Sequence, residues 1–221
     1  MAEELTNQQL GEGEEPFEPI DNTKVLIAIT KKTGQEHIAV TAEEYGSFDK
    51  RKYSTDGIII RNEDIDVDLL YALYEVEAVM GDGDTDIPET DKRRKNAPSN
   101  PSFNELDGEY RTAWQMQNHP DTHESGCAVC EALKFGWLNS CGEATQLRDH
   151  RDAFNEACQA VGATPVGAEA RYWTSTQYDK EYMWHLDMAT GVFGFWACKA
   201  TRMMVRPVRS AADYIEPVMN N

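Results

Sequence analysis

Apolar and polar positions alternate most regularly near the C-terminal end of the chain. One side of the extended segment 182–188 carries large apolar side chains, namely Tyr182, Trp184, Leu186 and Met188, and the opposite side carries Met183, His185 and Asp187. A period of two is typical of a β-strand with one buried face. Residues 189–191 predict a short turn ending in glycine, and residues 192–199 and 203–208 predict two further strands. We therefore expect a three-stranded antiparallel meander at residues 182–208.

Shorter β-type runs mark the first part of the chain. Residues 24–29 and 37–40 predict two strands joined by a turn at Thr33 and Gly34, and the β-branched run 58–60 follows a turn at Asp56 and Gly57. Residues 64–80 are ambiguous, because their apolar positions recur at three and four as in a helix, whereas residues 73–80 alone also suit a strand. We expect a small β-rich unit over about residues 23–80.

Two helices are predicted between these β-rich regions. The first covers about residues 125–135 and is followed by Gly136, and the second covers about residues 142–161 and is followed by Gly162. The second helix carries one apolar stripe, formed by Leu147, Phe154, Cys158 and Val161. Two helices that flank an antiparallel sheet predict an α+β fold.

Five short segments carry a family resemblance. They are YWTST at 172–176, the aromatic hairpin 182–191, VRPVR at 205–209, GWLNSCGE at 136–143, with Asn139 where proline is usual, and GEYRT at 108–112. Taken in their order along the chain, they resemble C-type-lectin-like domains of the Legionella collagen-like C-terminal and Fibrobacter major paralogous kinds. Such domains occur in bacterial adhesins and in phage virion proteins, including crAss-like head fibres. The resemblance covers about residues 103–210 and implies a C-type-lectin-like fold with a role in attachment.

Composition and charge narrow the classes of partner. The chain has 39 acidic and 21 basic residues, a net charge of −18. Like charges repel, so we expect neither nucleic acid nor an anionic membrane as a partner. No apolar run approaches the length of about twenty residues that spans a bilayer. The first 22 residues lack the basic and apolar regions of a secretory signal, which weighs against a secreted adhesin.

The acidic N-terminal segment suggests an assembly. Residues 1–22 contain seven acidic residues and no basic one, so we expect this tail to be held by a partner rather than by the chain itself. The expected organisation is this tail, a base at 23–80 that builds a homotrimer, a linker at 81–102 with a basic cluster at 92–95, the lectin-like domain at 103–210 and a C-terminal tail at 211–221. The expected partners are other copies of the chain, capsid proteins and a host-surface glycan or protein.

The cysteines do not form a convincing metal site or disulfide framework. They are Cys127, Cys130, Cys141, Cys158 and Cys198, and an odd number without a secretory signal favours reduced thiols. His123 together with the first three cysteines offers possible zinc ligands, but a single CxxC pair on a helix is a weak signal. The acidic loop at 82–93 fails as an EF-hand, because Ile87 and Arg93 stand where glycine and glutamate are needed. We expect no metal and no cofactor.

Catalysis is the least favoured function. The lectin-like fold also includes formylglycine-generating oxidases, which rely on two cysteines near the C-terminal strands, and only Cys198 lies there. Glu143 fits a charge in a first helical turn or a hydrogen bond that fixes the fold better than a general acid. The main hypothesis is a non-enzymatic phage virion protein, a head fibre, capsid decoration or receptor-binding component. The alternatives are a bacterial surface adhesin of the same domain family and, behind it, the oxidase.

Alternation along the terminal hairpin also predicts a binding tip. If Trp184 is buried, Met183, His185 and Asp187 point outward, and either Phe193 and Phe195 or Trp196 do the same. Exposed aromatic rings on a rigid sheet suit a sugar ring or a flat protein surface. The alternative is that a neighbouring subunit or the N-terminal unit covers these rings. We further expect Trp137, Trp173 and Trp184 to be buried.

Overall fold

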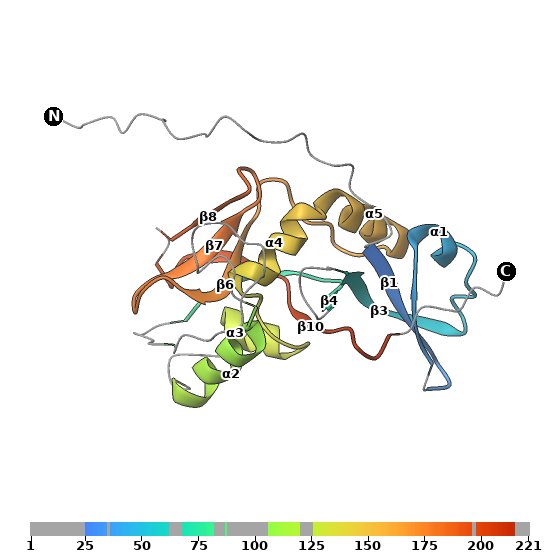
Figure 1. Cartoon of the computed structure of the whole chain (residues 1–221), viewed down its shortest axis with the longest axis horizontal. Coiled ribbons are helices and arrows are strands. Elements are labelled where there is room, and N and C mark those ends of the chain that lie inside the picture. The colour runs from blue at the N-terminus through green and yellow to red at the C-terminus, as the bar shows by residue number, and fades with distance from the viewer. Residues whose placement is uncertain are drawn as a thin grey trace.

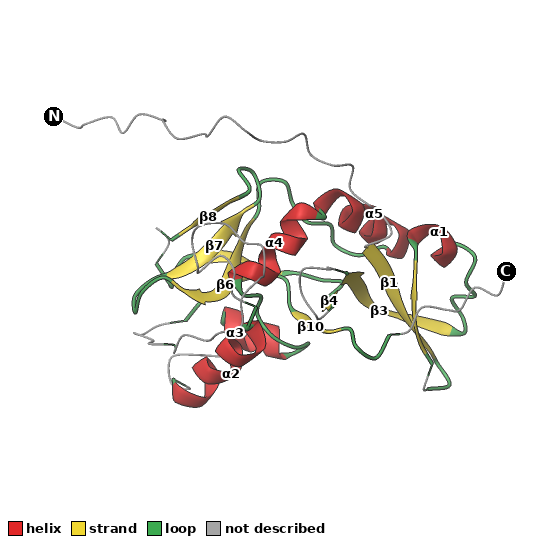
Figure 2. Cartoon of the chain, in the orientation of Figure 1, coloured by secondary structure: helices red, strands yellow, loops and turns green. Residues whose placement is uncertain are grey.

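The computed structural model describes residues 25–34, 36–61, 68–81, 87, 106–119, 126–195 and 198–214. These residues form an α+β structure with two five-stranded sheets and five helices (Figure 1, Figure 2). The first sheet has the order β10-β4-β3-β1-β2 and consists of β1 (Val25–Lys31), β2 (His37–Val40), β3 (Tyr53–Ile60), β4 (Leu69–Tyr71) and β10 (Val208–Ser210). The α+β class expected from the sequence is confirmed.

The first sheet forms where the sequence predicts strands. β1 and β2 make an antiparallel hairpin, and β3 pairs with the other edge of β1. Alternate side chains of β1 enter different clusters, since Ile27 and Ile29 join the largest apolar core while Leu26 and Ala28 pack on the opposite side with Ala211. This sheet is therefore buried on both faces, which explains why its strands read as nearly continuous apolar runs.

Residues 64–80 contain strands in their described part, so the helical interpretation is wrong. β4 lies between β3 and β10 in the first sheet, and β5 (Val76–Val79) lies at an edge of the second sheet. Residues 62–67 lie outside the described part. The helical spacing misleads because pairing with neighbouring strands and burial on both faces decide the conformation of so short an apolar run.

The second sheet has the order β5-β9-β6-β7-β8. Besides β5 it consists of β6 (Arg171–Gln177), β7 (Met183–Asp187), β8 (Val192–Gly194) and β9 (Arg202–Val205). β7 and β8 form the predicted hairpin, whose turn contains Gly191 in the left-handed region at φ 68°. However, β9 pairs antiparallel with β5 and parallel with β6, so it does not follow β8 in the sheet. The predicted three-stranded meander is therefore wrong beyond its hairpin.

Helices cover the sheets from different sides. The helices are α1 (Ala42–Tyr45), α2 (Gly108–Asn118), α3 (Ala128–Leu133), α4 (Cys141–Asp149) and α5 (Arg151–Val161). Figure 1 shows α4 and α5 running end to end, and they contact different sheets, α4 the strands β6 and β7 and α5 the strands β1 and β3. The predicted helix at 142–161 is thus two helices that break at His150. α1 and α2 lie outside the two helices that the sequence predicts, and α2 begins at the segment GEYRT.

Two chain crossings join the sheets. β4 leads to β5 through residues 72–75, and β9 leads to β10 through residues 206–207, so each crossing leaves one sheet and enters the other. The crossings are bonded to each other, because the amide of Ala72 donates to the carbonyl of Pro207 and the guanidinium of Arg206 donates to the carbonyl of Ala72. Strands from before residue 80 therefore pair with strands from after residue 200 in both sheets, while the division into units at 23–80 and 103–210 stays a prediction.

Arg206 is the buried centre of this junction. Its guanidinium lies 2.7 Å from the carboxylate of Glu75 and 2.7 Å from the carbonyl oxygen of Thr164. Tyr172 donates its hydroxyl to the same carboxylate at 2.6 Å. Moving the two crossings apart would leave Arg206 and Glu75 as buried charges without their partners, which is energetically costly. The ion pair therefore holds the two crossings in one arrangement.

In the described part of the chain, no helix has the length and apolar character needed to cross a membrane.

Candidate functional site

The predicted tip residue His185 is buried, and so are its neighbours on β7. The expectation that Met183, His185 and Asp187 point to solvent is wrong, because all five residues of β7 are buried. Met183 packs in a cluster with Trp173 and with residues of α3, which covers this side of the second sheet. Burial lowers the pKa of His185 to about 4, so its ring is neutral at neutral pH.

Asp187 fixes the hairpin turn. One carboxylate oxygen accepts from the side chain of Arg171 at 2.9 Å, and the other accepts from the amides of Ala189 and Thr190. Burial alone would raise the pKa of Asp187, but these hydrogen bonds outweigh it and lower the pKa. Asp187 is therefore occupied in holding the turn, and the structure does not place it in a binding tip.

The two phenylalanines after the turn differ in burial. Phe193 lies in the largest apolar core, which contradicts its expected exposure, whereas the side chain of Phe195 is 40% exposed. Alternation would place both on one face, but β8 ends at Gly194, so Phe195 is free to turn away from the sheet. Trp196 lies outside the described residues. Of the predicted tip, Phe195 is the residue that the structure places at the surface.

Phe195 belongs to an exposed aromatic group that the sequence did not indicate. Its ring stacks on that of Tyr178, with centroids 4.0 Å apart and planes 11° apart. Both rings meet Trp184 edge to face, at 5.1 Å from Tyr178 and 5.3 Å from Phe195. Tyr178 is 46% exposed, while Trp184 is buried as expected. We call Tyr178, Phe195 and the supporting Trp184 the aromatic ledge.

Hydrogen bonds fix the backbone that carries the ledge. Tyr178 begins a tight turn after β6, in which its amide donates to the carbonyl of Tyr182. The carboxylate of Asp179 accepts from the amides of Glu181 and Tyr182 and closes the turn. Because the turn is held from within, Tyr178 meets Phe195 in a defined geometry. In the sequence, the signal for an exposed tyrosine at this position is the turn-forming segment YDKEY at 178–182.

Glu143 ties together two of the segments that carry the family resemblance. Its carboxylate accepts from the amides of Ser140 and Gly108 and from the indole nitrogen of Trp137. A Cβ on Gly108 would lie 2.2 Å from that carboxylate, so only glycine allows this approach. Burial raises the pKa of Glu143 to about 7 against the opposing effect of the hydrogen bonds. The carboxylate is enclosed by donors of the chain itself, as expected for a residue that fixes the fold.

The predicted tryptophans and cysteines have mainly packing roles. Trp173 and Trp184 are buried as expected, whereas Trp137 is only partly buried. Cys127 caps the start of α3 by accepting from the amide of Cys130, and burial raises its pKa to about 12. Among the described residues, no group of three or more His, Cys, Asp or Glu side chains is arranged to hold a metal ion, and the possible ligand His123 lies outside that part.

The chain matches no protein-family model and no curated protein. Among solved structures it is similar to the crystal structure of a fimbrial protein from Bacteroides ovatus, with a TM-score of 0.48 and 14% sequence identity. The similar region covers 63% of this chain and 35% of the fimbrial protein. So distant a likeness carries no argument about activity or ligand, and the C-type-lectin-like assignment stays a prediction.

Proposed function

We propose that this chain is a non-enzymatic attachment protein of the adhesin type, which binds its target through the aromatic ledge. The observation that supports this proposal most directly is the stacked pair of exposed rings, Tyr178 and Phe195, at a centroid distance of 4.0 Å. Aromatic side chains that are exposed together as one patch mark a contact surface more often than side chains exposed singly do. The bacterial cell surface is the proposed setting, and the virion setting stays a prediction from the sequence.

The position of the ledge adds support. Two of the six large apolar side chains that are exposed in the described residues, Tyr178 and Phe195, stack on each other here. Phe195 directly follows β8, the last strand in the order of the second sheet, so the stacked pair lies beside an edge strand of this sheet. Apolar side chains gathered at one edge form a contact surface, whereas single exposed side chains scattered over a protein carry no such meaning.

The geometry suits a flat, weakly polar target. Tyr178 and Phe195 each have only two side-chain torsions, and both are held against Trp184, so little conformational entropy is lost on binding. The outer face of such a stack can receive a sugar ring or a flat apolar patch of a protein. We propose a ring-shaped carbohydrate or a protein surface of this kind as the target, with no covalent chemistry at the site.

The test replaces both rings of the ledge. The double variant Tyr178→Ser and Phe195→Ser should lose about tenfold or more in adsorption to bacterial cells or to immobilised glycans, because hot-spot aromatics dominate such contacts. Its melting temperature should change little, since both side chains are substantially exposed. Phe195→Tyr keeps a ring and should retain adsorption. Tyr110→Ser is the matched control, because Tyr110 is 41% exposed but lies on α2.

Three outcomes would contradict the proposal. Unchanged adsorption of the double variant would remove the ledge from the binding surface. Loss of adsorption together with a much lower melting temperature, repeated by Phe195→Tyr, would assign the two rings to packing instead. Adsorption lost equally in Tyr110→Ser would show that the assay reports general surface hydrophobicity.

A further inference from the structure

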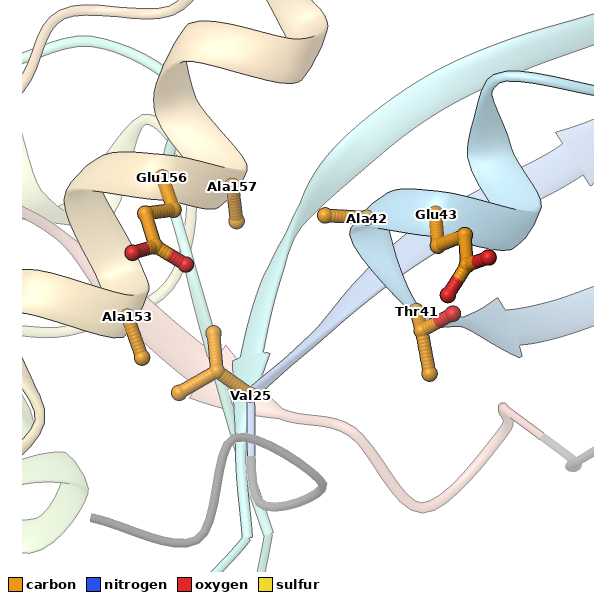
Figure 3. Close-up of a pocket in the computed structure, with 7 residues that line it drawn as sticks. All are labelled: Val25, Thr41, Ala42, Glu43, Ala153, Glu156 and Ala157. Atoms are coloured by element: carbon orange, nitrogen blue, oxygen red, sulfur yellow. The ribbon is translucent and has the colours of Figure 1, made fainter. Parts of the chain in front are cut away.

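A concave site lies beside the first sheet, away from the aromatic ledge. It is a cavity of about 300 Å³ between α1 and α5, with the first residue of β1, Val25, at its base (Figure 3). Figure 3 shows the side chains of Ala42 from α1 and Ala153 and Ala157 from α5 facing this space. The volume is at the lower end of the range for ligand pockets, so the cavity suits one side chain better than a large ligand.

Small residues create the hollow. Ala153, Glu156 and Ala157 are spaced three and four positions apart and therefore lie on one face of α5. With alanine at two of these positions, and Ala42 opposite them, the helices leave space that larger side chains would fill. The floor is consequently apolar, with Val25 and the three alanines supplying carbon atoms for an aliphatic chain.

The rim of the cavity is acidic. Glu43 and Glu156 line it from opposite helices, and within the described residues neither carboxylate has an ion-pair partner (Figure 3). Thr41 also lines the cavity, but its hydroxyl and amide are engaged in the capping box with Glu44. The polar groups of Thr41 are therefore already hydrogen-bonded, and the two carboxylates remain as the charges at the rim. Their negative charge favours a cation over an anion.

We propose that this cavity binds a lysine or arginine side chain of a partner polypeptide. The aliphatic stem of such a side chain would pack on Val25 and the alanines, while its charged head would meet Glu43 and Glu156. An acidic side chain would be repelled by the two carboxylates, and an uncharged apolar side chain would leave them without a partner. The net charge of −18 adds long-range attraction for a basic partner surface.

Short capped peptides test the proposal on the full chain. The probes are acetyl-Gly-Lys-Gly-amide, the same peptide with arginine, with the uncharged norleucine, and with glutamate in the central position. Binding is followed by NMR through the methyl signals of Ala42 and Ala157. The lysine and arginine peptides should shift these signals with an affinity that falls as salt is added, because exposed ion pairs are screened. The norleucine peptide should bind more weakly and the glutamate peptide should not bind.

Variants separate the cavity from the overall charge. Glu43→Gln together with Glu156→Gln should weaken binding of the lysine peptide roughly two- to tenfold, from two exposed ion pairs of modest strength. Ala42→Leu should prevent binding by filling the cavity while both carboxylates remain. The control Glu169→Gln removes one negative charge at an exposed position that does not line the cavity, and it should bind normally.

The outcomes are decisive in both directions. Absence of any shift with the lysine and arginine peptides overturns the proposal, as does equal binding of the norleucine peptide. Full affinity in the double glutamine variant, or equal loss in Glu169→Gln, also overturns it, because the attraction would then be unrelated to this rim. Serine at Tyr178 and Phe195 should leave the peptide titration unchanged, so the cavity and the ledge are tested independently.

Discussion

Replacing Glu143 with alanine tests how far one buried carboxylate holds the fold. The carboxylate accepts hydrogen bonds from the Ser140 amide at 2.8 Å, the Gly108 amide at 3.3 Å and the Trp137 indole at 3.3 Å. These donors come from α2, from the segment before α4 and from the capping box of α4 itself. In Glu143→Ala all three donors lose their acceptor at once.

The loss in the free energy of unfolding follows from the number of buried donors that are left without an acceptor. A buried donor without an acceptor costs about 1–3 kcal/mol, and three such donors, one of them only partly buried, give about 4 kcal/mol. Glu44→Ala is a matched control, because Glu44 occupies the same position in the capping box of α1. Among the described residues its carboxylate accepts hydrogen bonds from Thr41 alone, so the control should cost roughly 1 kcal/mol.

The contribution of Glu143 to the free energy of unfolding depends on pH, and its pKa shift sets the direction of that dependence. Its pKa rises from 4.5 to about 7 on folding, so the folded state binds a proton more tightly than the unfolded state. The stabilisation from protonated Glu143 is complete below pH 4.5 and is lost as the pH rises through about 7. The difference between the two pKa values corresponds to about 3 kcal/mol. The cost of Glu143→Ala should therefore be largest at pH 5 and smaller at pH 8.

Urea denaturation at pH 5 and pH 8 measures both effects. The free energy of unfolding is compared between the natural chain, Glu143→Ala and Glu44→Ala, so that groups common to all three cancel. A cost for Glu143→Ala no greater than that for Glu44→Ala would refute the role of the three donors. A cost that grows from pH 5 to pH 8 would show that the hydrogen bonds, and not burial, control the pKa of Glu143.

Two further predictions concern the junctions between strands. Trp173→Ala should lower the free energy of unfolding by about 3–5 kcal/mol, because it leaves a cavity and removes the hydrogen bond from the indole to the Ala78 carbonyl; a loss under about 1 kcal/mol in urea denaturation would contradict this. Arg206→Met should cost about 3–5 kcal/mol by leaving the Glu75 carboxylate buried without its partner. Adding Glu75→Gln should recover part of that loss in the same assay, and no recovery would argue against the ion pair.

The sequence alone determined the local elements whose signals are strong. The hairpin at the start of the first sheet, the strand at 58–60, the helix end at Gly162 and the hairpin turn at Gly191 all form as predicted. Each is set by interactions between residues close in sequence, such as apolar alternation, a turn glycine or a helix cap. The motif residue Glu143 was likewise expected to fix the fold, and its contacts agree.

Only the tertiary structure decided which faces and edges meet. Alternation placed His185 opposite Trp184 correctly, but whether that opposite face meets solvent or α3 depends on residues far away in the sequence. The position of β9 beside β6, the break at His150 and the stacking of Tyr178 on Phe195 are likewise long-range outcomes. The physical reason is that a periodic pattern fixes the sides of an element, whereas burial of each side is settled by the other elements that pack on it.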